Sequence, residues 1–135
     1  MRPIQPSGGA EYARRRTRLG ALGERLAAAH LESKGYRLID RNWRCPEGEV
    51  DLVVERDGCL VFVEVRTRRG TAHGSPEESV TGVKAARLLA VAEAYAQAHP
   101  EAPEDRRIDL VAVELSPEGR LLRVDHIEAA VEEPS

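Results

Sequence analysis

The segment from Gly48 to Arg68 constrains the fold more than any other part of the chain. It contains two runs rich in β-branched residues that meet at Asp57-Gly58, the dipeptide that best accepts the positive φ angles of a type I′ turn. A two-residue loop fixes the register of a β-hairpin, so Arg56 should face Cys59. Counting outward from the turn, we expect these further pairs: Val54 with Val61, Val53 with Phe62, Leu52 with Val63, Asp51 with Glu64, Val50 with Val65 and Glu49 with Arg66.

This register predicts one wholly apolar face, because side chains alternate between the two faces of a strand. The members of that face are Val50, Leu52, Val54, Val61, Val63 and Val65. Such a face must be buried. The opposite face is apolar near the turn, but its far end gathers Glu49, Asp51, Glu64 and Arg66.

The pair of Asp51 and Glu64 needs an explanation. Directly opposed carboxylates, with Cβ atoms about 5 Å apart, repel each other and destabilise a sheet. A divalent cation would offset the repulsion, because Mg²⁺ binds through one or two carboxylates and keeps waters for chemistry or for substrate phosphates. One alternative is a solvated end of the sheet, at which Arg66 neutralises both acids. A β-bulge would also shift the register by one residue and separate the pair.

Two blocks of the hairpin carry a family resemblance. Gly48 to Leu52 reads Gly-Glu-Val-Asp-Leu, and Phe62 to Arg68 reads Phe-Val-Glu-Val-Arg-Thr-Arg. Together they resemble the YraN-like family of small bacterial proteins, which is similar to the restriction-endonuclease-like nucleases and to archaeal Holliday-junction resolvases. The resemblance implies a metal-dependent phosphodiesterase site, with an acid from the first strand and Glu-x-Lys from the second. These roles carry over to Asp51 and Glu64.

The lysine of the family pattern is replaced by Arg66 in this chain. A guanidinium keeps its proton at physiological pH, so Arg66 cannot act as a base, although it can bind phosphate or balance the charge of the carboxylates. The alternative is Lys84, on the main helix that we expect between about Thr81 and His99. We place Lys84 at the edge of the buried stripe of that helix, from where its ammonium could reach the acids. We favour Arg66 for this role and treat Lys84 as a candidate contact to DNA.

The first helix is predicted over Leu19 to Lys34, where leucines recur at helical spacing and Gly35 supplies the stop. Glu24 lies on a stripe of small residues that favours close packing, and the resembled resolvases take one metal ligand from their first helix. The predicted metal ligands are therefore Asp51 and Glu64, supported by Glu24 and Glu49. The predicted catalytic residues are Asp51, Glu64, Arg66 and Glu24.

The remaining pattern completes an α/β fold. We expect a strand over Tyr36 to Trp43, a capping box at Ser75 to Glu78, a main helix ending near His99, a buried parallel strand over Arg106 to Leu115 and an edge strand over Arg120 to Ile127. With the hairpin, these elements give a restriction-endonuclease-like core in the order α-β-β-β-α-β, with a mixed sheet flanked by helices. We assign this core to a single domain, residues 18–127.

The charges of the chain are unevenly distributed. Its net charge of −3 argues against a generic nucleic-acid binder, but residues 1–44 carry ten Lys or Arg against four acids. We expect residues 1–17 to form a mobile basic arm and residues 128–135 an acidic tail. The candidate contacts to DNA phosphates are Arg14, Arg15, Arg16, Arg18, Arg68, Arg69 and Lys84.

Several classes of protein are disfavoured. The two cysteines form no Cys-x-x-Cys pair, which argues against a zinc site, and no apolar run reaches the ~20 residues of a membrane span. We expect a soluble, cytoplasmic protein without a membrane partner, for which a homodimer remains open. The favoured function is a Mg²⁺- or Mn²⁺-dependent endonuclease acting on branched or damaged DNA. The alternative is a catalytically silent nucleic-acid-binding or DNA-repair accessory module.

Overall fold

A computed structural model describes residues 10–70 and 82–131, and for residues 10–17 it gives the course of the helix alone. Its elements are α1 (Ala10–Ser33), β1 (Arg37–Cys45), β2 (Gly48–Arg56), β3 (Cys59–Arg69), α2 (Gly82–Ala98), β4 (Arg106–Leu115) and β5 (Leu121–Val131). This order confirms the predicted α-β-β-β-α-β core and adds β5 as the expected edge strand. The expected capping box at Ser75 to Glu78 lies outside the described residues. Neither α1 nor α2 combines the length and the apolar character that a membrane-spanning helix needs.

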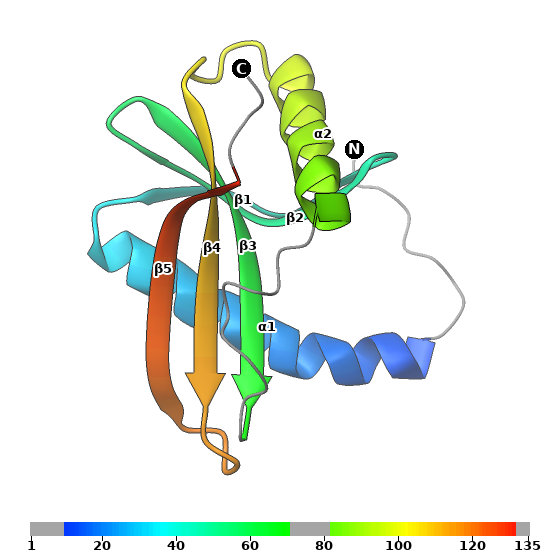
Figure 1. The fold of residues 1–135 in the computed structure, drawn as a ribbon, viewed down its shortest axis with the longest axis vertical. Coiled ribbons are helices and arrows are strands. Elements are labelled where there is room, and N and C mark those ends of the chain that lie inside the picture. Colours follow the sequence, from blue (N-terminus) through cyan, green and yellow to red (C-terminus); the bar gives the residue numbers. More distant parts are fainter. Residues whose placement is uncertain (1–9, 71–81, 132–135) are drawn as a thin grey trace.

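The five strands form one mixed sheet in the order β1-β2-β3-β4-β5 (Figure 1). β1, β2 and β3 are joined as an antiparallel meander, whereas β3 and β4 are parallel and are connected through α2. A parallel pair requires such a crossover, because a tight turn can join only antiparallel neighbours. β5 returns antiparallel to β4.

The hairpin turn has the predicted conformation. Asp57 and Gly58 have φ angles of 52° and 75°, as a type I′ turn requires. From there the ladder runs through Arg56–Cys59, Glu55–Leu60, Val54–Val61, Val53–Phe62 and Leu52–Val63. The predicted register is therefore confirmed up to Leu52 and Val63.

The predicted pairing is wrong beyond Leu52, because no ladder pair joins Asp51 with Glu64, Val50 with Val65 or Glu49 with Arg66 among the residues described. A side chain takes the place of the main-chain partner. The Val65 N–H donates to Asp51 Oδ2 at 2.7 Å. β2 continues to pair with β1 on its other side as far as Gly48, so the two strands of the hairpin separate at Asp51.

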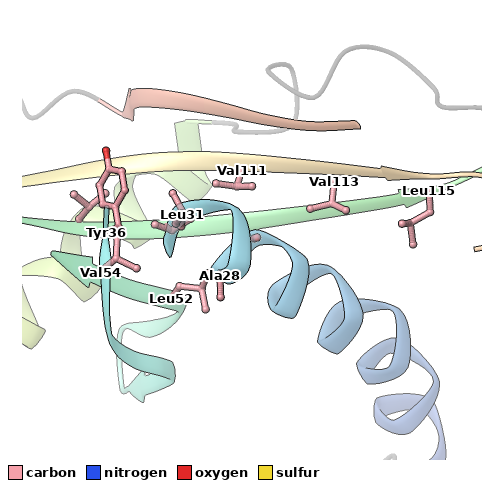
Figure 2. Close-up of a cluster of buried hydrophobic side chains, with 11 residues drawn as sticks. Ala28, Leu31, Tyr36, Leu52, Val54, Val111, Val113 and Leu115 are labelled. Carbon is pink, nitrogen blue, oxygen red and sulfur yellow. The ribbon is translucent and has the colours of Figure 1, made fainter. Parts of the chain in front are cut away.

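Two apolar clusters lie on opposite faces of the sheet. One packs under α1 and contains Ala27, Ala28, Leu31, Tyr36, Leu52, Val54, Val61, Val63, Val111, Val113 and Leu115 (Figure 2). The other packs under α2 and contains Val50, Val53, Leu60, Phe62, Leu88, Val91, Ala92, Tyr95 and Ile108. The predicted apolar face of the hairpin is thus confirmed except at Val50, which is buried in the α2 cluster instead.

The break in alternation at Val50 has a local cause. Leu52 and Val50 are two residues apart and would share a face in a regular strand. Between them, the position of β1 that lies opposite Asp51 is Asn42, which has a left-handed φ of 49° and is missing from the ladder. β2 thus changes faces at Asp51, which lies opposite the left-handed Asn42 and has no ladder partner on either side within the described sheet.

The ends of two elements differ from the prediction. α1 begins at Ala10 instead of Leu19, so the helix includes residues 10–17, which we expected to belong to a mobile basic arm. Apart from Thr17, this stretch consists of Ala, Glu, Tyr and Arg, without Gly or Pro, and several of these residues favour helix without any apolar stripe. β5 runs to Val131 instead of ending at Ile127, so the strand includes residues 128–131, which we expected to belong to the acidic tail.

The outer strands are irregular and are fastened by polar contacts. β1 has a register shift between Leu38 and Asp40, and the pairing of β4 with β5 shifts twice. The fully buried carboxylate of Asp109 on β4 receives hydrogen bonds from the Arg107 guanidinium, His126 Nε2 and the Ala129 N–H. This network attaches the end of β5 to the sheet.

Candidate active site

A pocket of about 770 Å³ lies where the hairpin opens, between α1 and α2. Each wall comes from a different part of the chain. The lining residues are Leu19, Gly20 and Glu24 of α1; Arg44, Cys45, Gly48 and Glu49 of the β1–β2 turn region; Asp51, Glu64, Val65, Arg66 and Thr67 of β2 and β3; and Lys84, Arg87 and Leu88 of α2. The four acids that the sequence predicted as metal ligands therefore share one pocket, together with both candidate cations, Arg66 and Lys84.

Asp51 is the acid with the most perturbed environment. Burial raises its pKa from 3.8 to about 8, and the negative charge of Glu64 adds to this effect. The hydrogen bond from the Val65 N–H acts in the opposite direction, because it stabilises the carboxylate. Without a metal ion in the pocket, Asp51 is therefore largely protonated at neutral pH.

Glu64 lies deep in the pocket between two cations. Only 9% of its side chain is exposed. Lys84 Nζ lies 2.5 Å from Glu64 Oε2, whereas Arg66 Nε lies 3.7 Å from the same oxygen. A helix residue thus makes the closer contact, and the arginine at the position of the family lysine is the more distant partner.

Glu24 and Glu49 occupy the rim of the acidic group. The pKa of Glu24 is raised by burial, and the Asn42 side chain, which hydrogen-bonds to it, lowers it in part. The nearby charges of Glu49 and Glu64 add to the rise. Glu49 is paired with Arg44 Nε at 3.1 Å across the tight turn between β1 and β2.

The described lining of the pocket contains two cations beyond the predicted Arg66 and Lys84. Arg44 and Arg87 line it, although neither was predicted as a site residue. A signal for each existed: Arg44 faces Glu49 across a short turn, and Arg87 follows Lys84 by three residues and so shares its side of the helix.

Three of the predicted DNA contacts lie away from the pocket. Arg18, Arg68 and Arg69 are absent from its lining, and Arg69 Nε donates to the Pro117 carbonyl in the turn between β4 and β5. Arg14, Arg15 and Arg16 lie in the first part of α1. Of the predicted phosphate contacts, Lys84 alone reaches the pocket within the described ranges.

The donor set fits a hard divalent cation held by few protein ligands. Within residues 10–70 and 82–131, no three His, Cys, Asp or Glu side chains converge into a complete ligand cluster. Asp51 and Glu64 nevertheless lie close enough for the charge of one to raise the pKa of the other. Mg²⁺ is commonly held by one or two carboxylates and keeps several waters, so this pair would suffice, with Glu24 and Glu49 as further oxygen donors.

Comparison with known proteins identifies the family. Residues 23–113 match the model described as "Uncharacterised protein family UPF0102". The chain is 49% identical over 121 residues to a UPF0102 protein of Roseiflexus castenholzii, which covers 88% of this chain and 97% of the relative. This chain belongs to the UPF0102 family. The resemblance to the YraN-like proteins is thereby confirmed.

Further UPF0102 relatives align over most of their length. A protein of Clavibacter michiganensis is 48% identical over 112 residues, covering 83% of this chain and 94% of the relative. One of Frankia alni is 47% identical over 112 residues, covering 83% and 92%. The part matched by the UPF0102 model contains all four acids of the pocket and also Arg66 and Lys84.

Proposed function

We propose that this UPF0102 protein is a metal-dependent endonuclease that hydrolyses phosphodiester bonds of DNA. The observation that carries the proposal is the meeting of Asp51 and Glu64 in one pocket, at the point where two adjacent strands separate. Both acids are costly to the fold where they are: one has a strongly raised pKa, and the other is almost fully buried. Strongly perturbed acids in a cleft are typical of functional sites.

Each protein group would contribute a distinct step. Asp51 and Glu64 would hold Mg²⁺ or Mn²⁺, and Glu24 and Glu49 would support them. The ion would lower the pKa of the attacking water and neutralise charge on the scissile phosphate. Only 9% of the Glu64 side chain is exposed, and its low contact with water strengthens the electrostatic interactions at the base of the pocket.

The geometry favours Lys84 over Arg66 as the cation that acts beside Glu64. Lys84 approaches the carboxylate more closely by 1.2 Å, the difference between 3.7 and 2.5 Å. The ammonium of Lys84 is a compact charge on a flexible side chain. It could therefore move from Glu64 to a phosphate oxygen when a metal ion binds to the acids. Arg66 would then balance the remaining charge or bind a neighbouring phosphate oxygen.

A catalytically silent DNA-binding module is the second candidate. The replacement of the family lysine by Arg66 supports it. In that case the cations of the pocket would hold DNA, and the acids would limit how tightly it binds.

A cleavage assay distinguishes the two candidates. Purified protein is incubated with linear, nicked, flapped and four-way DNA in EDTA, Mg²⁺ or Mn²⁺. Cleavage that requires the metal and is abolished in both Asp51→Asn and Glu64→Gln supports the endonuclease. Cleavage that persists in both variants would trace to a contaminant and leave the silent module as the better description.

The same assay assigns the cation. Lys84→Ala should lower the cleavage rate more strongly than Arg66→Ala, and Arg66→Lys should keep or raise it. The opposite order, with Arg66→Ala inactive and Lys84→Ala unaffected, would show that Arg66 of β3 is the cation that acts beside Glu64.

A further inference from the structure

Gly20 is an unusual residue for the middle of a helix. Glycine is among the least favourable residues inside an α-helix, so a glycine there usually reflects close packing. A Cβ added at Gly20, however, would meet no atom of the described residues within 4 Å. The residue faces open space on the α1 wall of the pocket, one helical turn from Glu24.

Gly23 shows what a packing glycine looks like on the same helix. A Cβ added there would lie 1.8 Å from Thr67 Oγ1 of β3, which is far inside any normal contact. Gly23 is therefore required for the approach of α1 to the sheet. Gly20 has no such requirement from the described chain, so the bare surface at this position is available to a ligand.

The walls of the pocket differ in chemistry. Among the residues whose side chains are described, the α1 wall consists of Leu19, Gly20 and Glu24, without a cation. The described cations that line the pocket come from the other walls: Arg44, Arg66, Lys84 and Arg87. A phosphate backbone would be held on the cationic side. The sugar or base of the same nucleotide would then point toward the apolar, bare stretch of α1.

The size of the pocket limits what can enter. Its volume of about 770 Å³ lies within the range of small-molecule sites, so it accommodates a nucleotide and not a duplex. Proteins that hold single-stranded DNA commonly do so with a positively charged groove that follows its backbone. No aromatic side chain is among the described lining residues, so recognition would depend on phosphate and shape more than on base stacking.

We propose that the pocket takes an unpaired stretch of a DNA strand, with its phosphates on the cationic walls and a sugar or base against the bare backbone of α1 at Gly20. This inference rests on the proposed function, since it names the form of DNA that the same site would accept. It makes Gly20 a residue kept for the ligand at a cost to the helix.

Binding of defined DNA to the full chain tests the proposal without relying on cleavage. The probe is a fluorescent oligothymidylate in Ca²⁺, a hard cation that also takes oxygen ligands, compared with the same strand paired to oligodeoxyadenylate. The single strand should bind at least about tenfold more tightly than the duplex, a difference of roughly 1.4 kcal/mol.

Variants at Gly20 separate a ligand contact from a structural role. Gly20→Ala should raise the melting temperature by about 2–4 °C through helix propensity, and Gly20→Leu should weaken binding of the single strand at least about tenfold. The matched control is Ala29→Leu, which adds the same side chain to an exposed position of α1 outside the pocket and should leave binding unchanged.

The possible outcomes separate this inference from the proposed function. Equal or tighter binding of the duplex, unaltered binding by Gly20→Leu, or a lower melting temperature of Gly20→Ala would each overturn the inference. A lower melting temperature would mean that the protein itself fills the space. Binding as expected without metal-dependent cleavage would support the inference and refute the endonuclease. Metal-dependent cleavage of duplex and single strand alike would support the endonuclease and refute the inference.

Discussion

Asp51 should make the protein less stable as the pH rises toward neutrality when no metal is present. Its pKa is 3.8 when unperturbed and about 8 in the folded protein. The folded state therefore keeps a proton that the unfolded state releases above about pH 4. Between about pH 4 and about pH 8 the unfolded state binds fewer protons, so the free energy of unfolding falls with increasing pH.

The size of this effect follows from the linkage relation. A single group that is protonated in the folded state and ionised in the unfolded state changes the free energy of unfolding by about 1.4 kcal/mol per pH unit. Asp51→Asn removes the titration but keeps a side-chain oxygen for the Val65 N–H. The free energy of unfolding of the variant, measured relative to that of the wild type, should therefore rise by up to about 2.7 kcal/mol between about pH 5 and about pH 7.

Urea unfolding followed by circular dichroism, in buffers containing EDTA, measures this difference at each pH. Asp57→Asn is the matched control: it makes the same chemical change at the hairpin turn, where the side chain is 90% exposed. Its difference from the wild type should not change with pH as that of Asp51→Asn does. If the difference between Asp51→Asn and the wild type is the same at every pH, Asp51 is ionised in the folded state and our account of the pocket is incorrect.

Four further results are expected. Mn²⁺ should raise the melting temperature of the wild type but not of Asp51→Asn, as measured by scanning calorimetry. Gly23→Ala should lower the free energy of unfolding in urea by about 1–3 kcal/mol through its clash with Thr67. Asp109→Ala should cost about 3–5 kcal/mol in the same measurement, because Arg107 is then left without its buried partner. Deleting residues 1–17 should flatten the salt dependence of DNA binding by about one unit of log–log slope for each phosphate that the shortened protein no longer neutralises, as titrations at several salt concentrations would show.

The hairpin could be predicted because its turn and its apolar alternation specify the same register. Asp57-Gly58 fixes which residues of the two strands face each other, and the alternating β-branched residues show which face of the hairpin is buried. This reasoning fails beyond Leu52, where the Asp51 carboxylate competes with the main chain for the Val65 N–H. The periodicity of apolar residues gives no sign of such a contact between a side chain on one strand and the backbone of the next.

The candidate site was predictable in its acids and less so in its cations. The acids follow from two blocks of sequence within one hairpin. The cations come from elements outside the hairpin: Lys84 and Arg87 lie on α2, and Arg44 lies beside the β1–β2 turn. The positions of these elements relative to the acids depend on tertiary packing. The start of α1 could not be predicted from apolar spacing, because its first residues rely on intrinsic helix propensity instead.

The irregular outer strands have a consequence for self-assembly. A straight strand at the edge of a sheet offers a row of free main-chain groups to any other extended chain and invites aggregation. Here β1 is interrupted at Ile39 and Asn42, and β5 twists out of register around the left-handed Ala129. An incoming strand would find no continuous ladder to extend on either side. The same distortions that open the hairpin and fasten β5 thus protect a small, strand-rich protein from joining its copies edge to edge.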